Sequence, residues 1–253
     1  MNKENIKTIN ERIKFIQELE LDIPIGDYII GKRQLHTSNI PSAAVDGASL
    51  QSFVANLDFQ GKSDVLNSTL LGQLAANKKF SREEKPEEWY NFYKSVLENV
   101  GWVLQEFNFN KYKASTASFE TSKAIIEVLS ALCTGNEILI VKSAIDALNA
   151  LKTEDNRVTI FEQNSHSLKK GNFQISICNQ QNRQITMKVG CFYFDTSENI
   201  VRVLWHKFSS SKCNMYSGGQ VITLNEDIYS RVRDSVIKKL GDNALKFIDD
   251  LEI

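Results

Sequence analysis

The second half of the chain, roughly residues 157 to 224, is the stretch that most restricts the fold. Apolar and polar residues alternate along it in short runs, and polar connections such as NQQNR and DTSEN separate the runs. A period of two is typical of strands with one buried face, and short polar connections are typical of hairpins. We therefore predict four strands and a fifth that closes the set, at residues 157–163, 172–178, 184–194, 200–209 and 219–224.

Helical periodicity governs most of the remaining chain. Apolar residues recur at spacings of three and four before the strands and again in the last segment, where Asn225 is placed to cap a helix. We predict helices at residues 3–21, from Ser49 or Ser52 to 57, 63–80, 81–100, 124–151 (a pair broken at 134–136) and 227–249. Between them we predict a short strand at 28–30 and a hairpin of 102–109 with 113–119.

These elements together indicate an α+β fold. Helices before and after an antiparallel meander predict an antiparallel sheet of about 5–7 strands, mainly in the second half, wrapped by amphipathic helices. The 253 residues contain no repeat, no low-complexity tract and no long linker. We therefore expect one domain over residues 1–253, with a helical part at about 1–151, a β-meander at about 157–224 and a C-terminal helix at about 226–249.

Charge and motifs argue against nucleic acid and nucleotide as partners. The formal net charge is −1, and the basic pairs are separated and lack interleaved aromatic residues. Neither GxxxxGK[ST] nor GxGxxG occurs in the sequence. The basic pairs are Lys32-Arg33, Lys78-Lys79, Lys169-Lys170 and Lys238-Lys239. We interpret them as solvated faces.

The N-terminal segment MNKENIKTINERIKFIQELEL does not resemble a secretory signal, because it lacks an apolar core of the length that such a signal needs. No run of about 20 apolar residues is present, so no transmembrane helix is expected. We expect the protein to be made in the cytoplasm. Export would use a non-classical route, or a lipid would associate the protein with a membrane.

Four cysteines carry the candidate chemistry. They form no CxxC pair, and none of the three histidines (His36, His166, His206) has zinc-ligand spacing to a cysteine pair, so we expect free thiols and neither metal nor cofactor. Cys133 and Cys191 fit small buried apolar residues. Cys178, before the turn NQQNR, and Cys213, beside Lys212 in a serine-rich loop, are predicted to be reached by solvent. The two are candidates for S-acylation or for a nucleophilic role, and the alternative is idle surface thiols.

The histidines do not complete a catalytic site by sequence alone. Ser165-His166-Ser167 is predicted in a solvated loop, no GxSxG elbow occurs, and His206 is predicted at the edge of the core, bonded to backbone. We therefore predict a protein that is not an enzyme. A thiol-dependent acyl transferase or hydrolase that pairs Cys178 or Cys213 with His166 is kept as a further hypothesis.

Four segments together resemble the Evf-type virulence factors, a small group typified by a protein of an insect-associated, plant-pathogenic bacterium. They are SDVLNSTLLGQLAANKKF (63–80), WYNFYKSVLENVGW (89–102), SHSLKKGNFQIS (165–176) and LWHKFSSSKCNMYSGGQVITLNEDIYSRVRDSVIKKLGDNA (204–244). The resemblance covers most of the chain after residue 40 and implies an antiparallel sheet wrapped by helices. It also implies covalent palmitate on one cysteine, held in an apolar pocket, and a role in persistence inside an insect host. Cys178 is the first choice for lipid attachment and Cys213 the second. The partner would be the acyl chain or a membrane lipid, and the host target is left open.

The apolar helix pair at 124–151 leaves two readings open. It is either a core hairpin packed on the sheet or a hairpin that detaches and enters a membrane, although each arm, at about 12–14 residues, is too short to span the hydrocarbon core. Helix hairpins around an antiparallel sheet are also similar in architecture to the Cyt-type insecticidal cytolysins, without a motif in common. A pore-forming or membrane-perturbing toxin is therefore the alternative function.

Overall fold

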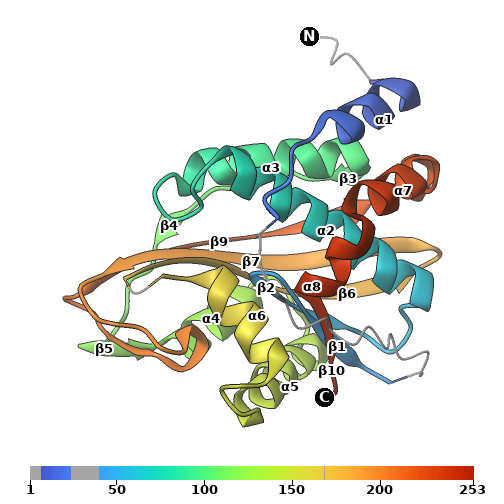
Figure 1. Ribbon diagram of the computed structural model, residues 1–253. Coiled ribbons are helices and arrows are strands. Elements are labelled where there is room, and N and C mark those ends of the chain that lie inside the picture. Colours follow the sequence, from blue (N-terminus) through green and yellow to red (C-terminus); the bar gives the residue numbers. More distant parts are fainter. Residues whose placement is uncertain (1–6, 24–39, 168) are drawn as a thin grey trace, which may run out of the picture.

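A central β-sheet with helices on both faces forms the body of the computed structural model (Figure 1). The structure describes residues 7–23, 40–167 and 169–253. Within these ranges the main sheet has eight strands in the order β10-β1-β2-β6-β7-β9-β3, with β4 also paired to β9. The strands are β1 (Ser42–Asp46), β2 (Ser49–Phe53), β3 (Trp102–Val103), β4 (Asn110–Lys111), β6 (Lys170–Gln181), β7 (Gln184–Thr196), β9 (Cys213–Leu224) and β10 (Ile248–Leu251), while β5 (Ser118–Glu120) and β8 (Lys207–Ser209) form a separate pair.

The three longest strands confirm the predicted meander at 172–178, 184–194 and 219–224. β6 and β7 form a hairpin whose two turn residues, Asn182 and Arg183, have φ of 51° and 65°. Positive φ at both positions gives the turn type whose twist matches that of the flanking strands. β7 then pairs with β9 in antiparallel register from Ile185 to Thr196. β2 differs from these pairings, since it joins β6 in parallel.

Helices cover the sheet in two layers (Figure 1). One layer packs on one face and holds α1 (Ile9–Glu18), α2 (Phe59–Lys79), α3 (Pro86–Val100) and α7 (Glu226–Leu240). The other layer packs on the opposite face and holds α4 (Thr121–Ser130), α5 (Gly135–Ala150) and α6 (Asn156–Ser165). Three short helical elements lie in the connections, namely η1 (Val203–Trp205), η2 (Gly241–Asn243) and α8 (Ala244–Phe247).

Local sequence explains where several helices begin and end. The Asp58 carboxylate accepts a hydrogen bond from Gly61 N and caps α2, which therefore starts before the predicted residue 63. Pro86 occupies the first turn of α3, and Gly101, at φ 115°, ends that helix as predicted. Asn225 caps α7, also as predicted. Asp58 and Asn225 thus satisfy backbone N–H groups that have no partner within their helix, and Gly101 N–H donates to carbonyl oxygens at the end of α3.

Each helical layer shares a core with its own face of the sheet. Successive residues of a strand point to opposite faces, so Ile177 of β6 lies in the core beneath α4, α5 and α6, whereas Cys178 lies in the core beneath α2, α3 and α7. A sheet buried on both faces and enclosed by two helical layers confirms the α+β class and the single domain.

The predicted strand at 157–163 is wrong, because these residues belong to α6. Asp155 caps this helix through Arg157 N, and the buried side chains of Val158, Phe161 and Ser165 follow helical spacing. The run RVTIF is β-branched and apolar enough to look like a strand. The cap and the burial on one helical face determine the structure instead.

Two further predictions are also wrong. Residues 200–209 do not form a strand beside β7, because β9 occupies that position along the whole length of β7. Only β8 remains of this prediction, and it pairs with β5. The helix predicted from Ser49 or Ser52 is β2, which fits between β1 and β6 with alternate side chains on opposite faces.

Two other predicted elements differ in the structure. The hairpin of 102–109 with 113–119 does not form, since β3 and β4 both pair with β9 and β5 pairs with β8. The last helix ends at Leu240 rather than at 249, because Gly241 adopts φ 54° and the chain returns as β10 beside β1. Three features of the sequence lie outside the described residues. They are the strand predicted at 28–30, the pair Lys32-Arg33 and His36.

Candidate functional site

Cys178, the first choice for lipid attachment, lies in the core rather than at a turn. β6 continues past it to Gln181, and its side chain is 0% exposed. It is level with Met187 on β7 and Phe53 on β2. Burial raises the pKa of the thiol far above its usual range. The expected solvent access of Cys178 is therefore wrong, and an acyl chain attached there would have to lie in the core on the α2 side of the sheet.

Cys213, the second choice, is buried as well. It is the first residue of β9, pairs with Thr196 and is 7% exposed. Burial raises the pKa of its thiol to about 12, and the charges of Glu198 and Asp195 add to the rise. Lys212 is adjacent in the sequence, but burial and the two carboxylates favour the neutral thiol.

The remaining two cysteines differ from each other in exposure. Cys191 is fully buried on β7, as predicted. Cys133 lies half-buried in the loop between α4 and α5, where burial and the charge of Glu137 raise its pKa to about 11. Cys133 is thus the most accessible of the four thiols, although its place in an apolar helix pair had predicted a buried residue.

Both ring nitrogens of His166 lie at hydrogen-bonding distance from an oxygen, one from a carboxylate and one from a carbonyl group. Its Nε2 atom lies 2.7 Å from Glu162 Oε2, and its Nδ1 atom lies 2.7 Å from the carbonyl oxygen of Ser167. An imidazolium, which donates from both nitrogens, matches these two acceptors. His166 closes the end of α6 with a side chain only 9% exposed, so the solvated loop predicted for it is wrong. The described contacts of this ring are to oxygen and not to the thiol of Cys178 or Cys213.

His206 lies at the edge of the core, as predicted, but its partner is a carboxylate. Its Nε2 atom lies 3.2 Å from Glu198 Oε2, and its ring centroid lies 4.5 Å from that of Phe208. Its backbone oxygen accepts hydrogen bonds from both N and Oγ1 of Thr121, the first residue of α4. The backbone of His206 therefore holds the start of α4, and its ring is bonded to Glu198 rather than free to act as a base.

The α4–α5 hairpin (residues 121–150) forms an apolar outer layer below the sheet in Figure 1. Its inner face packs on β6 and β7 through buried apolar side chains, namely Ala124, Ile125, Leu129, Ile138, Val141, Ala144, Ile145 and Leu148. Leu139, on its outer face, is 60% exposed. Of the two alternatives, the structure has the hairpin packed on the sheet. The outer side of the hairpin lies at the protein surface.

A few polar contacts fasten this hairpin to the body. Near its tip, the Glu137 carboxylate lies 2.6 Å from Lys188 Nζ and 3.2 Å from Asn179 Nδ2. At its base, Arg202 Nη2 donates to the carbonyl oxygen of Leu148 over 3.1 Å, and Thr121 bonds to His206 as described above. The sequence signals only one part of this arrangement, the Thr134–Glu137 capping box at the start of α5.

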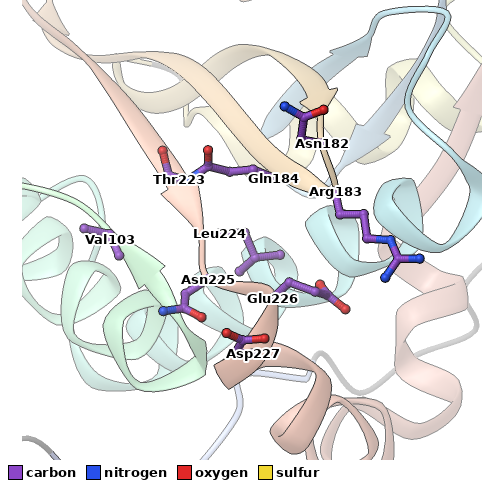
Figure 2. Close-up of a pocket in the computed structure, with 9 residues that line it drawn as sticks. All are labelled: Val103, Asn182, Arg183, Gln184, Thr223, Leu224, Asn225, Glu226 and Asp227. Atoms are coloured by element: carbon purple, nitrogen blue, oxygen red, sulfur yellow. The ribbon is translucent and has the colours of Figure 1, made fainter.

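A separate polar hollow of about 440 Å³ lies at the end of the sheet where the β6–β7 turn meets α7 (Figure 2). Figure 2 shows that its residues come from β3, this turn, the start of β7, the end of β9 and the first turn of α7. The lining side chains are mostly polar and include no cysteine. Within the described residues, His, Cys, Asp and Glu side chains are nowhere gathered in threes that could hold a metal ion.

Comparison with known proteins gives weak likenesses only. No family model matches the sequence, and no curated protein matches it. Among solved structures, the Evf virulence factor is 14% identical, with 93% of this chain and 88% of that chain covered, at a TM-score of 0.38. Activated Cyt2Ba from Bacillus thuringiensis subsp. israelensis is 12% identical, with 68% and 94% covered, at a TM-score of 0.35. A delta-endotoxin is 10% identical, with 79% and 89% covered, at a TM-score of 0.36. Likenesses this weak do not place the chain in a family.

Proposed function

We propose that this chain is a non-enzymatic virulence factor that acts at host membranes, and that the α4–α5 hairpin is the part that meets lipid. The observation that carries the membrane part is the position of this hairpin, an apolar layer at the surface with Leu139 exposed on its outer side. The virulence part rests on the resemblance of the four sequence segments between residues 63 and 244 to Evf-type factors.

Helix length decides how the hairpin would meet a bilayer. α4 has 10 residues and α5 has 16, which correspond to about 15 Å and about 24 Å of helix. A hydrocarbon core is about 30 Å thick. Among the described helices, none combines the length and apolarity needed to cross it. The hairpin would therefore lie along the interface, with its apolar side chains at the boundary between headgroups and acyl chains.

The energetics of this move depend on the sheet as well as on the hairpin, because the apolar side chains beneath it, such as Phe173, Ile175 and Phe192, would lose their cover. The inner face of the hairpin would exchange the apolar core for acyl chains, which are similarly apolar. The contact of Glu137 with Lys188 would be lost, because a carboxylate leaves its buried cation when α5 leaves the sheet. Departure of the hairpin is therefore opposed by exposure of this face of the sheet and by loss of the ion pair at the tip.

Vesicle binding tests the membrane part with a matched pair of variants. Leu139→Asp puts a charge on the exposed side of the hairpin, and Ile237→Asp puts one on an apolar residue, 46% exposed, on α7 in the opposite helical layer. We expect Leu139→Asp to weaken binding to lipid vesicles roughly tenfold or more, since an apolar contact becomes a buried charge. Ile237→Asp should bind like the parent chain. Failure of the parent chain to bind either neutral or anionic vesicles would overturn this part.

An acyl group on one cysteine is the second part of the proposal. A single chain contributes about 0.8 kcal/mol per buried CH₂, and alone it anchors a protein only marginally to a membrane. The burial of Cys178 and Cys213 favours a chain held inside the protein over one displayed outside it. Intact mass before and after neutral hydroxylamine, with mapping of the four cysteines, tests this part. Four unmodified thiols in protein from its native host would overturn acylation and leave the hairpin proposal standing.

The alternative, a membrane-perturbing toxin, uses the same hairpin. It predicts release of dye from vesicles and oligomers on the membrane. Binding without release supports the leading proposal, whereas release that Leu139→Asp abolishes would favour the alternative.

A further inference from the structure

The segment 197–209, which links β7 to β9 through η1 and β8, holds both ends of the α4–α5 hairpin. The carbonyl oxygen of His206 accepts from N and Oγ1 of Thr121, over 3.1 Å and 3.2 Å, at the start of α4. Arg202 Nη2 donates to the carbonyl oxygen of Leu148, near the end of α5. The position of this segment therefore determines how firmly the base of the hairpin is attached.

A single carboxylate fixes this segment to α6. Glu162 Oε2 accepts a hydrogen bond from Val203 N, in η1, over 3.0 Å. The same oxygen lies 2.7 Å from His166 Nε2. Both side chains are nearly buried, with 13% of Glu162 and 9% of His166 exposed. The imidazole thus holds the carboxylate in the position from which it bonds to the segment.

The two neighbours of the imidazole favour its protonated form. The Ser167 carbonyl oxygen, 2.7 Å from Nδ1, cannot donate, and neither can the Glu162 carboxylate at Nε2. A neutral ring would turn one nitrogen lone pair toward an oxygen at hydrogen-bonding distance. Loss of the proton to solvent therefore leaves one ring nitrogen with its lone pair toward an oxygen, and it removes the positive charge that strengthens the hydrogen bond to the Glu162 carboxylate.

Charges on neighbouring elements also act on this ring. Burial lowers the pKa of His166, but the hydrogen bonds to Glu162 and to the Ser167 carbonyl, with the charges of Glu162 and Glu83, outweigh burial and raise the pKa above its ordinary value of 6.5. Two cations of neighbouring elements have other partners. Lys170 of β6 pairs with Glu84 at 2.8 Å, and Arg82 Nη1 donates to the carbonyl oxygen of Asn164. On the side of η1, the Arg202 guanidinium stacks on Trp205 and bonds to α5.

We propose that His166 is a pH-sensitive clasp, and that loss of its proton as pH rises weakens the hold of Glu162 on segment 197–209 and loosens the base of the α4–α5 hairpin. The clasp regulates the hairpin on which the proposed function rests. A histidine with a raised pKa stabilises the folded state below its ordinary value of 6.5, and this stabilisation is lost as pH rises through the folded pKa. The clasp is therefore closed in acid and opens toward alkaline pH.

Amide hydrogen exchange of the intact chain tests the clasp without any membrane. Protection of peptides from residues 121–150 is measured from about pH 6 to about pH 9 and corrected for the intrinsic exchange rate. We expect protection to fall above pH 6.5, by at most tenfold per pH unit, which is the limit for release of one proton. His166→Gln should remove this fall. His206→Gln, which changes the other histidine–carboxylate pair of the segment, should keep it.

Three outcomes would overturn the clasp. These are constant protection in the parent chain, an unchanged fall in His166→Gln, and an equal fall in peptides from α2, which would mean global unfolding. If His166→Gln does not fold, Glu162→Gln serves instead, because its amide oxygen still accepts from Val203 N but carries no charge to hold an imidazolium. Since no lipid is used, failure of vesicle binding would count against the proposed function alone.

Discussion

The Nζ atom of Lys188 on β7 lies 2.6 Å from Oε2 of Glu137 on α5 and joins the tip of the α4–α5 hairpin to the sheet. Only 15% of the lysine side chain and 10% of the glutamate side chain are exposed. Asn179 of β6 and the capping residue Thr134 complete the hydrogen bonds of the carboxylate. A nearly buried ion pair with these additional partners couples the hairpin to the two central strands of the sheet.

Removal of either partner of this pair should destabilise the protein. We expect Glu137→Ala and Lys188→Ala each to lower the free energy of unfolding by about 2–3 kcal/mol, because each leaves a nearly buried charge without its partner. The double variant should show a coupling energy of about 1–2 kcal/mol in a double-mutant cycle measured by urea unfolding. The exposed pair Lys14–Glu18, 3.8 Å apart and 74% and 66% exposed, is the matched control and should show almost none. A Glu137–Lys188 coupling as small as that of the control would contradict this account.

Acid should weaken the same contact. Burial raises the pKa of Glu137, but the hydrogen bonds from Lys188, Thr134 and Asn179 outweigh burial, so the pKa lies below its ordinary value of 4.5. Its stabilising contribution is therefore complete above pH 4.5 and is lost as pH falls through the folded pKa. Stability measured by urea unfolding should fall less steeply with acid in Glu137→Gln than in the parent chain. Parallel curves for the two proteins would show that this carboxylate does not contribute.

The four thiols should differ in reactivity in the native state. Cys133 is half-exposed, whereas the other three are buried. We expect one thiol to react with a disulfide reagent in the folded protein and the rest to react only on unfolding. Because the pKa of Cys133 is raised to about 11, its rate should be at least about tenfold below that of a free cysteine near neutral pH. Cys133→Ser should abolish the native-state reaction, and a second reactive thiol in that variant would mean that the core opens.

The sequence allowed prediction of the elements whose signals are local. Period-two alternation located the three long strands, and caps such as Asn225 and Gly101 located helix ends. The capping box from Thr134 to Glu137 is readable in the same way. Its partner Lys188, which lies 51 residues from Glu137, is not, because that contact depends on how α5 packs against the sheet.

The prediction for Cys178 failed for a different physical reason. Polar residues after Cys178 were interpreted as a turn, but Asn179 to Gln181 are still paired in β6, and only Asn182 and Arg183 form the turn. Their polarity reflects the exposed end of a long hairpin rather than the end of the strand. Alternation alone does not show where a strand leaves the protein interior, so the depth of a cysteine near a strand end requires the tertiary structure.

A larger side chain at Gly72 should destabilise the protein, although glycine is itself unfavourable inside helix α2. A Cβ atom at this position would lie 2.7 Å from Cε2 of Tyr93 on α3, and the Tyr93 ring is held by a stack on Trp89 with 5.1 Å between centroids. Alanine favours a helix over glycine by about 1 kcal/mol, but overpacking a core costs about 1–3 kcal/mol. We therefore expect Gly72→Ala to lower the free energy of unfolding by about 1–2 kcal/mol in urea. Gly135→Ala at the start of α5, where nothing lies within 4 Å of the added Cβ, is the control and should be neutral or slightly stabilising. If Gly72→Ala were as stable as the parent chain, α2 and α3 would have to separate more easily than the packing of Trp89 and Tyr93 indicates.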